Sequence, residues 1–314
     1  MAGPRGVIAA AATPVRSDLS LDHDRLIAHC RWLLGPGGCD GINLLGTTGE
    51  ATSFSRAQRI GAMKAVAGSG LPLGRIMVGT GAAAFDDAAA LTAAARDLGF
   101  AGALLLPPFY YKRIDDDSLA AFVDTLIARV GQTDLRLYLY HIPQNTGVPY
   151  PVEVVARLRE RHADAVVGLK DSAGDLAYSR ELARRLPGFD VFPSSEGSLG
   201  EARASGFAGC ISATTNVTGP LARIAWRDPG SEDGRRAGAE ALAIREALGR
   251  VPLVAAVKAT LAEMKSDPEF ARLCPPLRGL TAEERSALSQ ALAGTAYPRL
   301  RAAARGGAEP ALPA

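Results

Sequence analysis

Reactive side chains stand at the ends of three short apolar runs in this chain of 314 residues. Thr47 follows GINLL, Tyr140 ends LRLYLY and Lys170 ends AVVGLK. Partial desolvation disfavours the charged form of a lysine, and a neutral amine can attack a carbonyl to form an imine. The alternative is an ordinary lysine at the end of a strand, paired with the neighbouring Asp171.

Tyr140 favours the first interpretation of Lys170. Imine formation needs a group that donates and accepts a proton near the carbonyl oxygen, and a phenol does both. Tyr138 and Tyr140 alternate along one run and are expected to point the same way, so only Tyr140 reaches the strand end. The alternative role for Tyr140 is that of a core tyrosine packed by its ring.

The turn Gly46-Thr47-Thr48-Gly49 offers hydroxyl groups and backbone N–H groups between two glycines. Such a turn can bind a carboxylate without an arginine. Taken alone, the same pattern is also typical of a tight turn in which a threonine caps the following helix.

These segments must be placed by the elements that precede them. Eight runs are mostly apolar without alternation, which is typical of parallel strands covered on both faces. They alternate with amphipathic helical segments, so the pattern predicts a (β/α)8 TIM barrel, whose functional side chains lie at the carboxyl ends of its strands. The strands are expected to start near Val7, Gly41, Arg75, Gly102, Leu135, Ala165, Asp190 and Gly209.

Helical segments continue beyond the eighth strand, so the chain is expected to have three parts. Residues 1–225 form the barrel, 226–300 a C-terminal helical extension, and 301–314, rich in Ala, Gly, Arg and Pro, a flexible tail. Ser53 and Asp175 are expected as helix caps. The expected helices are 22–34, 55–67, 85–98, 118–130, 152–161, 176–186, 197–204, 222–226, 232–248, 252–264 and 282–292.

Composition excludes several classes of function. The formal net charge is +2, with no basic block to indicate nucleic-acid binding and no acidic tract to indicate disorder. No run of 18 apolar residues predicts a membrane span, and the apolar run 7–12 is better explained as a first strand than as an export signal. Four cysteines and four histidines show no metal-binding spacing. We therefore expect reduced thiols, a cytoplasmic location and no bound metal.

Two motifs indicate other chemistry but lack their context. The segment 79–84, GTGAAA, matches a dinucleotide-binding turn, yet the next strand ends in Leu106-Pro107 where an acidic residue is required. No G-x-S-x-G motif occurs, and Ser194-Ser195-Glu196 is typical of a loop or cap.

Four motifs appear together, in order: GTTGE (46–50), YHIPQNTG (140–147), GLKDSAGD (168–175) and GCISATTNV (209–217). In this combination the chain resembles the dihydrodipicolinate synthase / N-acetylneuraminate lyase superfamily of class I, pyruvate-type aldolases. The resemblance extends from residue 12 to residue 284. It implies a cofactor-free enzyme in which substrate and lysine form a covalent imine, assembled as a homotetramer, a dimer of dimers.

The resemblance also implies the role of each site residue. Lys170 is the Schiff-base lysine and Tyr140 the proton relay. Thr47 links Tyr140 to Tyr110, which in the family often enters from a neighbouring subunit. The implied substrate-binding residues are Thr48, with its hydroxyl and backbone on the 2-oxo acid carboxylate, Gly46 in the same turn, and Ile211 through its backbone carbonyl.

Asn145 departs from the family pattern. True dihydrodipicolinate synthases carry an arginine there that binds the carboxylate of the aldehyde substrate, and an amide cannot make that charged, two-pronged contact. An asparagine at this position resembles the pattern of the hydroxyoxoglutarate aldolase branch instead, although that branch has a different loop after the second strand. His141 is a further substrate-binding candidate, with a loop histidine bonded to backbone as the alternative.

The sequence therefore predicts a Schiff-base lyase that cleaves or forms a carbon–carbon bond between pyruvate, or a related 2-oxo acid, and an aldehyde. Its substrate is of the 4-hydroxy-2-oxoglutarate or 2-oxo-3-deoxy sugar acid type. Three alternatives stay open: a 4-hydroxy-tetrahydrodipicolinate synthase, a 2-oxo-3-deoxy acid dehydratase, and a non-catalytic regulator that binds a 2-oxo acid.

Overall fold

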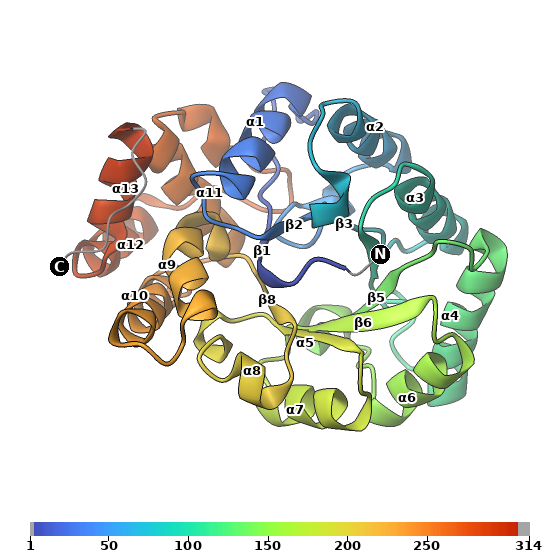
Figure 1. Ribbon diagram of the computed structural model, residues 1–314. Coiled ribbons are helices and arrows are strands. Elements are labelled where there is room, and N and C mark those ends of the chain that lie inside the picture. Colours follow the sequence, from blue (N-terminus) through green and yellow to red (C-terminus); the bar gives the residue numbers. More distant parts are fainter. Residues whose placement is uncertain (1–2, 307–314) are drawn as a thin grey trace.

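The structure is a computed structural model that describes residues 3–306. Eight parallel strands form one sheet in the order β7-β6-β5-β4-β3-β2-β1-β8, and Ala208 N–H donates to Val191 O (2.9 Å) between its two ends. This arrangement confirms the predicted (β/α)8 barrel (Figure 1). The strands are β1 (Gly6–Ala10), β2 (Gly41–Leu44), β3 (Ile76–Gly79), β4 (Gly102–Leu105), β5 (Leu137–His141), β6 (Val166–Asp171), β7 (Asp190–Pro193) and β8 (Gly209–Ser212).

Alternate strand residues face the barrel interior and the surrounding helices, since every residue of every strand is buried. The register places Asn43, Leu104, Lys170 and Ile211 of the even-numbered strands in one interior layer. Lys170 thus lies in the topmost interior layer of β6.

The layer beneath is filled by one large side chain. Glycines stand at the even-strand positions of this layer, and the ring of Tyr138 occupies the space that they leave. A Cβ on Gly102 would lie 2.6 Å from Tyr138 Cε2, and one on Gly168 would lie 2.5 Å from Tyr138 Cδ1. Tyr138 is fully buried and donates to Asp190 Oδ2 (3.4 Å), so this end of the barrel is closed by packed side chains.

The helices surround the strands in chain order. Asp175 caps α7 as predicted, whereas Ser55, and not Ser53, caps α2. The helix predicted at 197–204 is wrong, because a short 3₁₀ turn at Glu196–Ser198 and the single-turn α8 replace it. The helices of the barrel part are α1 (His23–Leu34), α2 (Arg56–Ala67), α3 (Phe85–Asp97), α4 (Asp116–Val130), α5 (Pro143–Thr146), α6 (Val152–Arg161), α7 (Leu176–Arg185), α8 (Ala202–Ser205) and α9 (Thr215–Arg227).

Further helices continue the chain beyond the barrel and lie together on one side of it (Figure 1). They are α10 (Glu232–Leu248), α11 (Leu253–Lys265), α12 (Ala282–Ala293) and α13 (Tyr297–Gly306). The expected boundary at residue 225 falls inside α9, which packs against both β1 and α10. Residues 301–306 of the expected tail are helical, a difference from the prediction, and the rest of that tail lies outside the described residues.

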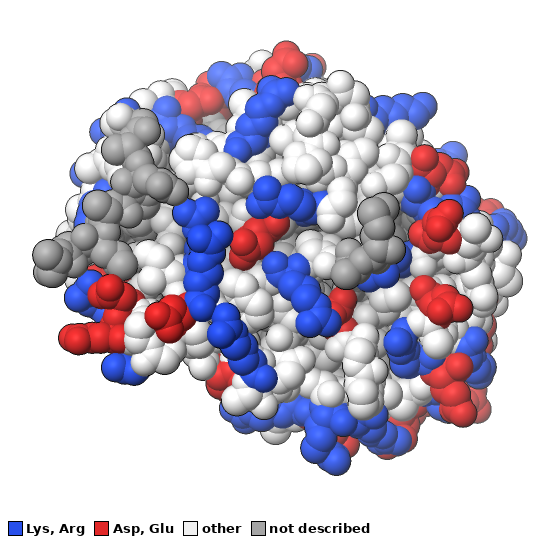
Figure 2. All heavy atoms as spheres, in the orientation of Figure 1, with Lys and Arg blue, Asp and Glu red and all other residues white. Residues whose placement is uncertain are grey.

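Charged side chains of both signs are interspersed over the face of the molecule in Figure 2. Within residues 3–306, no helix is long and apolar enough to cross a membrane.

Candidate active site

Lys170, Tyr140 and Thr47 form a chain of contacts at the carboxyl rim of the barrel. Lys170 Nζ donates to Tyr140 Oη at 3.0 Å, and Tyr140 Oη lies 3.3 Å from Thr47 Oγ1. Lys170 and Tyr140 are register partners on the adjacent strands β6 and β5, and both are almost fully buried. The amine, the phenol and the hydroxyl can therefore pass a proton between them.

The alternative pairing of Lys170 with Asp171 does not occur. Because residues alternate along β6, Asp171 faces the helix layer, where its carboxylate accepts from Ser179 Oγ (2.8 Å) and from the backbone N–H of Ala173 (2.8 Å). Burial raises the pKa of Asp171. The nearest polar partner of the Lys170 amine is thus a phenol and not a carboxylate.

The surroundings of Tyr140 favour its ionised form. Burial raises the pKa of a phenol, but here the charge of Lys170 and hydrogen bonds from Thr47, Ser172 and Lys170 outweigh it. The net result is a pKa below that of an ordinary tyrosine. A phenol whose pKa is lowered gives up its proton more readily, which suits a group that gives and takes a proton in turn.

The loop that carries Thr47 and Thr48 has a demanding backbone. Leu45 (φ 51°) and Glu50 (φ 55°) flank it in the left-handed region, which L-residues rarely adopt. A Cβ on Gly46 would lie 2.6 Å from Asn43 Nδ2, so the end of the buried Asn43 side chain would have to shift to accept any other residue there. Surrounding contacts must hold such a loop in place.

A buried ion pair supplies those contacts. Lys258 of α11 donates to Glu50 Oε1 (2.5 Å) and to Thr13 O (2.9 Å), and both charged side chains are fully buried. The other oxygen of Glu50 accepts the backbone N–H of Cys274 at 2.8 Å. The C-terminal helices thereby fix the end of the loop that presents Thr47 and Thr48.

A cavity of about 440 Å³ opens above Lys170, and we call it the lysine cavity. The loops after β2 and β5, the ends of β6, β7 and β8, and the C-terminal helices form its walls. Of the described residues that line it, none is Asp or Glu. Its polar and charged residues are Thr47, Thr48, Tyr140, Gln144, Asn145, Lys170, Ser172, Ser194, Arg245 and Arg278.

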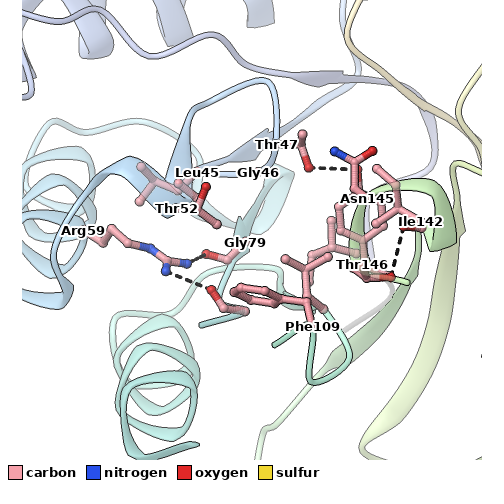
Figure 3. Close-up of a pocket in the computed structure, with 15 residues that line it drawn as sticks. Leu45, Gly46, Thr47, Thr52, Arg59, Gly79, Phe109, Ile142, Asn145 and Thr146 are labelled. Carbon is pink, nitrogen blue, oxygen red and sulfur yellow. Dashed lines mark hydrogen bonds between the residues drawn. The ribbon is translucent and has the colours of Figure 1, made fainter. Parts of the chain in front are cut away.

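A second cavity, of about 250 Å³, shares the wall formed by Thr47, Tyr140 and Asn145, and we call it the Arg59 cavity. Figure 3 shows it, with Thr47 and Asn145 near one another and Arg59 apart from them. Arg59 donates to the carbonyls of Gly79 (2.7 Å) and Gly81 (2.9 Å). The carbonyls of Gly79 and Gly81 in the GTGAAA segment therefore accept from an arginine side chain. The segment lies in a (β/α)8 barrel and not in the fold that the dinucleotide-binding motif requires, so that interpretation does not apply.

The structure brings most of the predicted substrate-binding residues to these cavities. Thr48, Asn145 and Ile211 line the lysine cavity with the proposed catalytic groups. Gly46 lines only the Arg59 cavity. Tyr110 is 74% exposed, and its ring packs edge-on against that of Tyr111 with 5.4 Å between the ring centroids. Within one chain it therefore does not reach Thr47.

The prediction that His141 contacts substrate is not supported by its position. It follows Tyr140 in β5 and so faces the helix layer, where its ring stacks on that of Tyr178 with 4.5 Å between the ring centroids. Its Nδ1 accepts the backbone N–H of Tyr150 at 3.0 Å. Burial lowers the pKa of His141 to about 4. The structure thus matches the alternative, a histidine bonded to backbone.

Sequence reasoning missed several residues of the lysine cavity. Ser172 and Ser194 follow β6 and β7, where their place after a strand could have indicated them. Arg245 reaches the cavity from α10, and nothing in its amphipathic segment distinguishes it from a surface arginine. Within the described part of the chain, no cluster of three or more His, Cys, Asp or Glu could hold a metal ion.

The fold and these side chains define a (β/α)8 barrel with a lysine-centred cavity at its carboxyl rim. The model of the dihydrodipicolinate synthetase family matches residues 3–295. The chain belongs to this family, whose members are enzymes.

Curated relatives extend the comparison. A protein of Chloroflexus aurantiacus named an uncharacterized DapA-like lyase is 37% identical over 94% of this chain and 99% of its own length. The 4-hydroxy-tetrahydrodipicolinate synthase of Methylococcus capsulatus is 31% identical over 92% of this chain and 97% of its own. Both cover the barrel and the C-terminal helices.

Solved structures show the same architecture. The dihydrodipicolinate synthase of Agrobacterium tumefaciens superimposes with a TM-score of 0.85 at 28% identity, covering 92% of this chain and 99% of that one. A 2-keto-3-deoxygluconate aldolase variant of Sulfolobus solfataricus gives a TM-score of 0.80 at 22% identity, covering 92% and 95%. At that identity the second likeness is one of fold.

The Glu50–Lys258 pair leads to a prediction about stability. Replacing Lys258 by methionine leaves the Glu50 carboxylate buried and uncompensated, so we expect Lys258→Met to lower the free energy of unfolding by about 3–5 kcal/mol. Lys64, exposed on α2, offers a matched control, and Lys64→Met should change it by less than roughly 0.5 kcal/mol. Urea denaturation measures both, and equal values for the two variants would show that the pair does not hold the loop.

Proposed function

We propose that this protein is a class I lyase that binds pyruvate, or a related 2-oxo acid, as an imine on Lys170. The observation that carries the proposal is the 3.0 Å contact from Lys170 Nζ to Tyr140 Oη, in a cavity that no described Asp or Glu lines. Thr47 and Thr48 bind the carboxylate of the 2-oxo acid beside it. The names of the relatives, lyases and synthases of one family, support this class of reaction.

The reaction begins when the Lys170 amine attacks the 2-oxo carbon and water leaves, giving an iminium ion. Tyr140 gives a proton to the departing oxygen. In the cleavage direction, Tyr140 takes the proton of the C4 hydroxyl, the C3–C4 bond breaks, and its electron pair moves into the iminium to form an enamine. The aldehyde leaves, the enamine takes a proton at C3, and water hydrolyses the imine to pyruvate and free Lys170.

The iminium formed between Lys170 and the 2-oxo acid serves as the electron sink, so the proposed reaction needs no cofactor. The same imine would permit the dehydratase alternative, in which a proton leaves C3 and the C4 hydroxyl leaves as water in place of C3–C4 cleavage. Asn145, exposed and neutral in the wall of the cavity, disfavours the 4-hydroxy-tetrahydrodipicolinate synthase alternative, because no charged contact arises at this position. The connected Lys170, Tyr140 and Thr47 disfavour the non-catalytic regulator.

Tyr110 gives a reason to expect more than one chain in the working enzyme. Its ring is exposed, and the Arg59 cavity opens beside Thr47 and Tyr140. We propose that Tyr110 of a neighbouring copy enters there and extends the proton relay, in a homotetramer built as a dimer of dimers. The four cysteines Cys30, Cys39, Cys210 and Cys274 are free and buried, which supports a cytoplasmic location.

Borohydride trapping tests the imine directly. Incubation with pyruvate and sodium borohydride should reduce the imine and leave a stable adduct on Lys170, located by mass spectrometry of peptides. Lys170→Ala should give no adduct and no turnover, because no other described lysine lines the cavity. The absence of an adduct in the wild-type protein would refute the proposed mechanism.

Two tyrosines of one strand separate proton relay from packing. Tyr140→Phe should lower kcat by about 10²–10⁴-fold, as expected for loss of a general acid–base. Tyr138→Phe removes a phenol two residues away on the same face, outside both cavities, and should leave kcat close to that of the wild type. Similar kcat values for the two variants, measured where both are folded, would exclude Tyr140 as the relay.

Subunit mixing tests the origin of Tyr110. Lys170→Ala and Tyr110→Phe chains should each be impaired alone. If Tyr110 enters from a neighbour, dissociating and reassembling the two together forms sites with an intact lysine and an intact tyrosine, and activity rises above the mean of the separate samples. A mixture that stays at that mean, although native mass spectrometry detects hybrids, would show that each site is complete within one chain.

A further inference from the structure

Arg245 brings a second cation to the cavity that holds Lys170. Its side chain is 26% exposed and lines the lysine cavity beside the end of β8. Its Nη1 lies 3.0 Å from Ser212 Oγ, 3.1 Å from Thr214 Oγ1 and 3.3 Å from Glu196 Oε2. The hydrogen bonds found for Arg245 within residues 3–306 all use Nη1, so Nε and Nη2 are free to bind a ligand.

Glu196 anchors this guanidinium without occupying the cavity. Its carboxylate is fully buried and accepts from the hydroxyls of Ser212 (3.0 Å), Thr214 (2.6 Å) and Thr218 (2.5 Å). Glu196 does not line the cavity, so a ligand meets the arginine and not the carboxylate. The hydroxyl oxygens of Ser212 and Thr214 accept from Arg245, and with the ion pair they hold it in one orientation, which reduces the entropy lost on binding.

The other charged groups of the cavity wall are already committed. Lys170 is the proposed nucleophile, and Arg278 donates to both oxygens of Glu284 at 2.7 and 2.8 Å. An arginine fork with two free N–H groups matches the oxygens of a carboxylate or a phosphate. Among the described residues of this wall none is acidic, and Arg245 is the group best placed to bind such an anion.

We infer that Arg245 binds a second anionic group of the substrate, distinct from the carboxylate that Thr47 and Thr48 bind. This inference rests on the proposed function and narrows its substrate class. The aldehyde released on cleavage carries a carboxylate or a phosphate ester.

Substrates that differ in this group test the inference. The probes are 4-hydroxy-2-oxoglutarate, which carries a distal carboxylate, a 3-deoxy-2-oxo sugar acid with a terminal phosphate, and the same sugar acid without phosphate. All three carry the 2-oxo acid carboxylate. The first two also carry a second anionic group and are called the anionic probes, whereas the third does not and is called the neutral probe. Pyruvate production gives kcat and KM for each. The wild-type protein should prefer one of the two anionic probes to the neutral one, and the preferred probe identifies the anion as carboxylate or phosphate.

Arg245→Gln should lower kcat/KM for the preferred anionic probe by roughly 10–100-fold, the effect of one charged hydrogen-bonding group, mainly through KM. The neutral probe should be affected much less, so that the ratio of the two kcat/KM values falls. Arg245→Lys, which keeps the charge and loses the fork, should retain part of the preference. Arg235→Gln, an exposed arginine at the start of the same helix, should leave the ratio unchanged.

Trapping with pyruvate distinguishes failure of the inference about Arg245 from failure of the proposed function. An adduct on Lys170 in each variant shows that the cavity is folded and that the proposed function holds. With that adduct present, an unchanged ratio in Arg245→Gln, or a wild-type protein that prefers the neutral probe or uses neither anionic one, overturns the inference about Arg245. A wild-type protein without an adduct instead contradicts the proposed function itself.

Discussion

The buried ion pair between Glu50 and Lys258 is the constraint on which the site depends. Two charges removed from water are tolerated only when they are paired and hydrogen-bonded, so the loop after β2 and the helix α11 must come together as the chain folds. The pair holds a loop bounded by left-handed residues, and that loop presents Thr47 to Tyr140. The C-terminal helices are therefore part of the site's framework and contribute Arg245 to its wall.

Much of the architecture could be predicted from local patterns in the sequence. Strands buried on both faces appear as short apolar runs, and all eight were located from this signal. Alternation along LRLYLY placed Tyr140 at the rim, the end of the run AVVGLK placed Lys170 on the next strand, and the structure joins them at 3.0 Å. Such predictions succeed because the position of a side chain within a strand fixes its direction.

Other residues depend on contacts that no local pattern encodes. The direction of His141 follows from the same alternation, whereas its proximity to Tyr140 in the sequence had made it a substrate-binding candidate. Arg245 enters the cavity only because α10 packs beside α9. Lys258 is a single cation within the apolar stretch LVAAVKATLA, which could have indicated a buried charge. Its partner Glu50, however, lies 208 positions away in the chain. Tyr110 depends on a neighbouring chain, which one sequence does not describe.

The packed ring of Tyr138 has a kinetic consequence. It fills the barrel beneath Lys170, so among residues 3–306 the amine is left open on the side of the rim, and the lysine cavity forms a passage to it. In the proposed reaction the pyruvyl unit is bound covalently at the bottom of that passage, and the aldehyde lies above it. Release is consequently ordered, with the aldehyde first and pyruvate second, and in the direction of synthesis pyruvate must bind before the aldehyde.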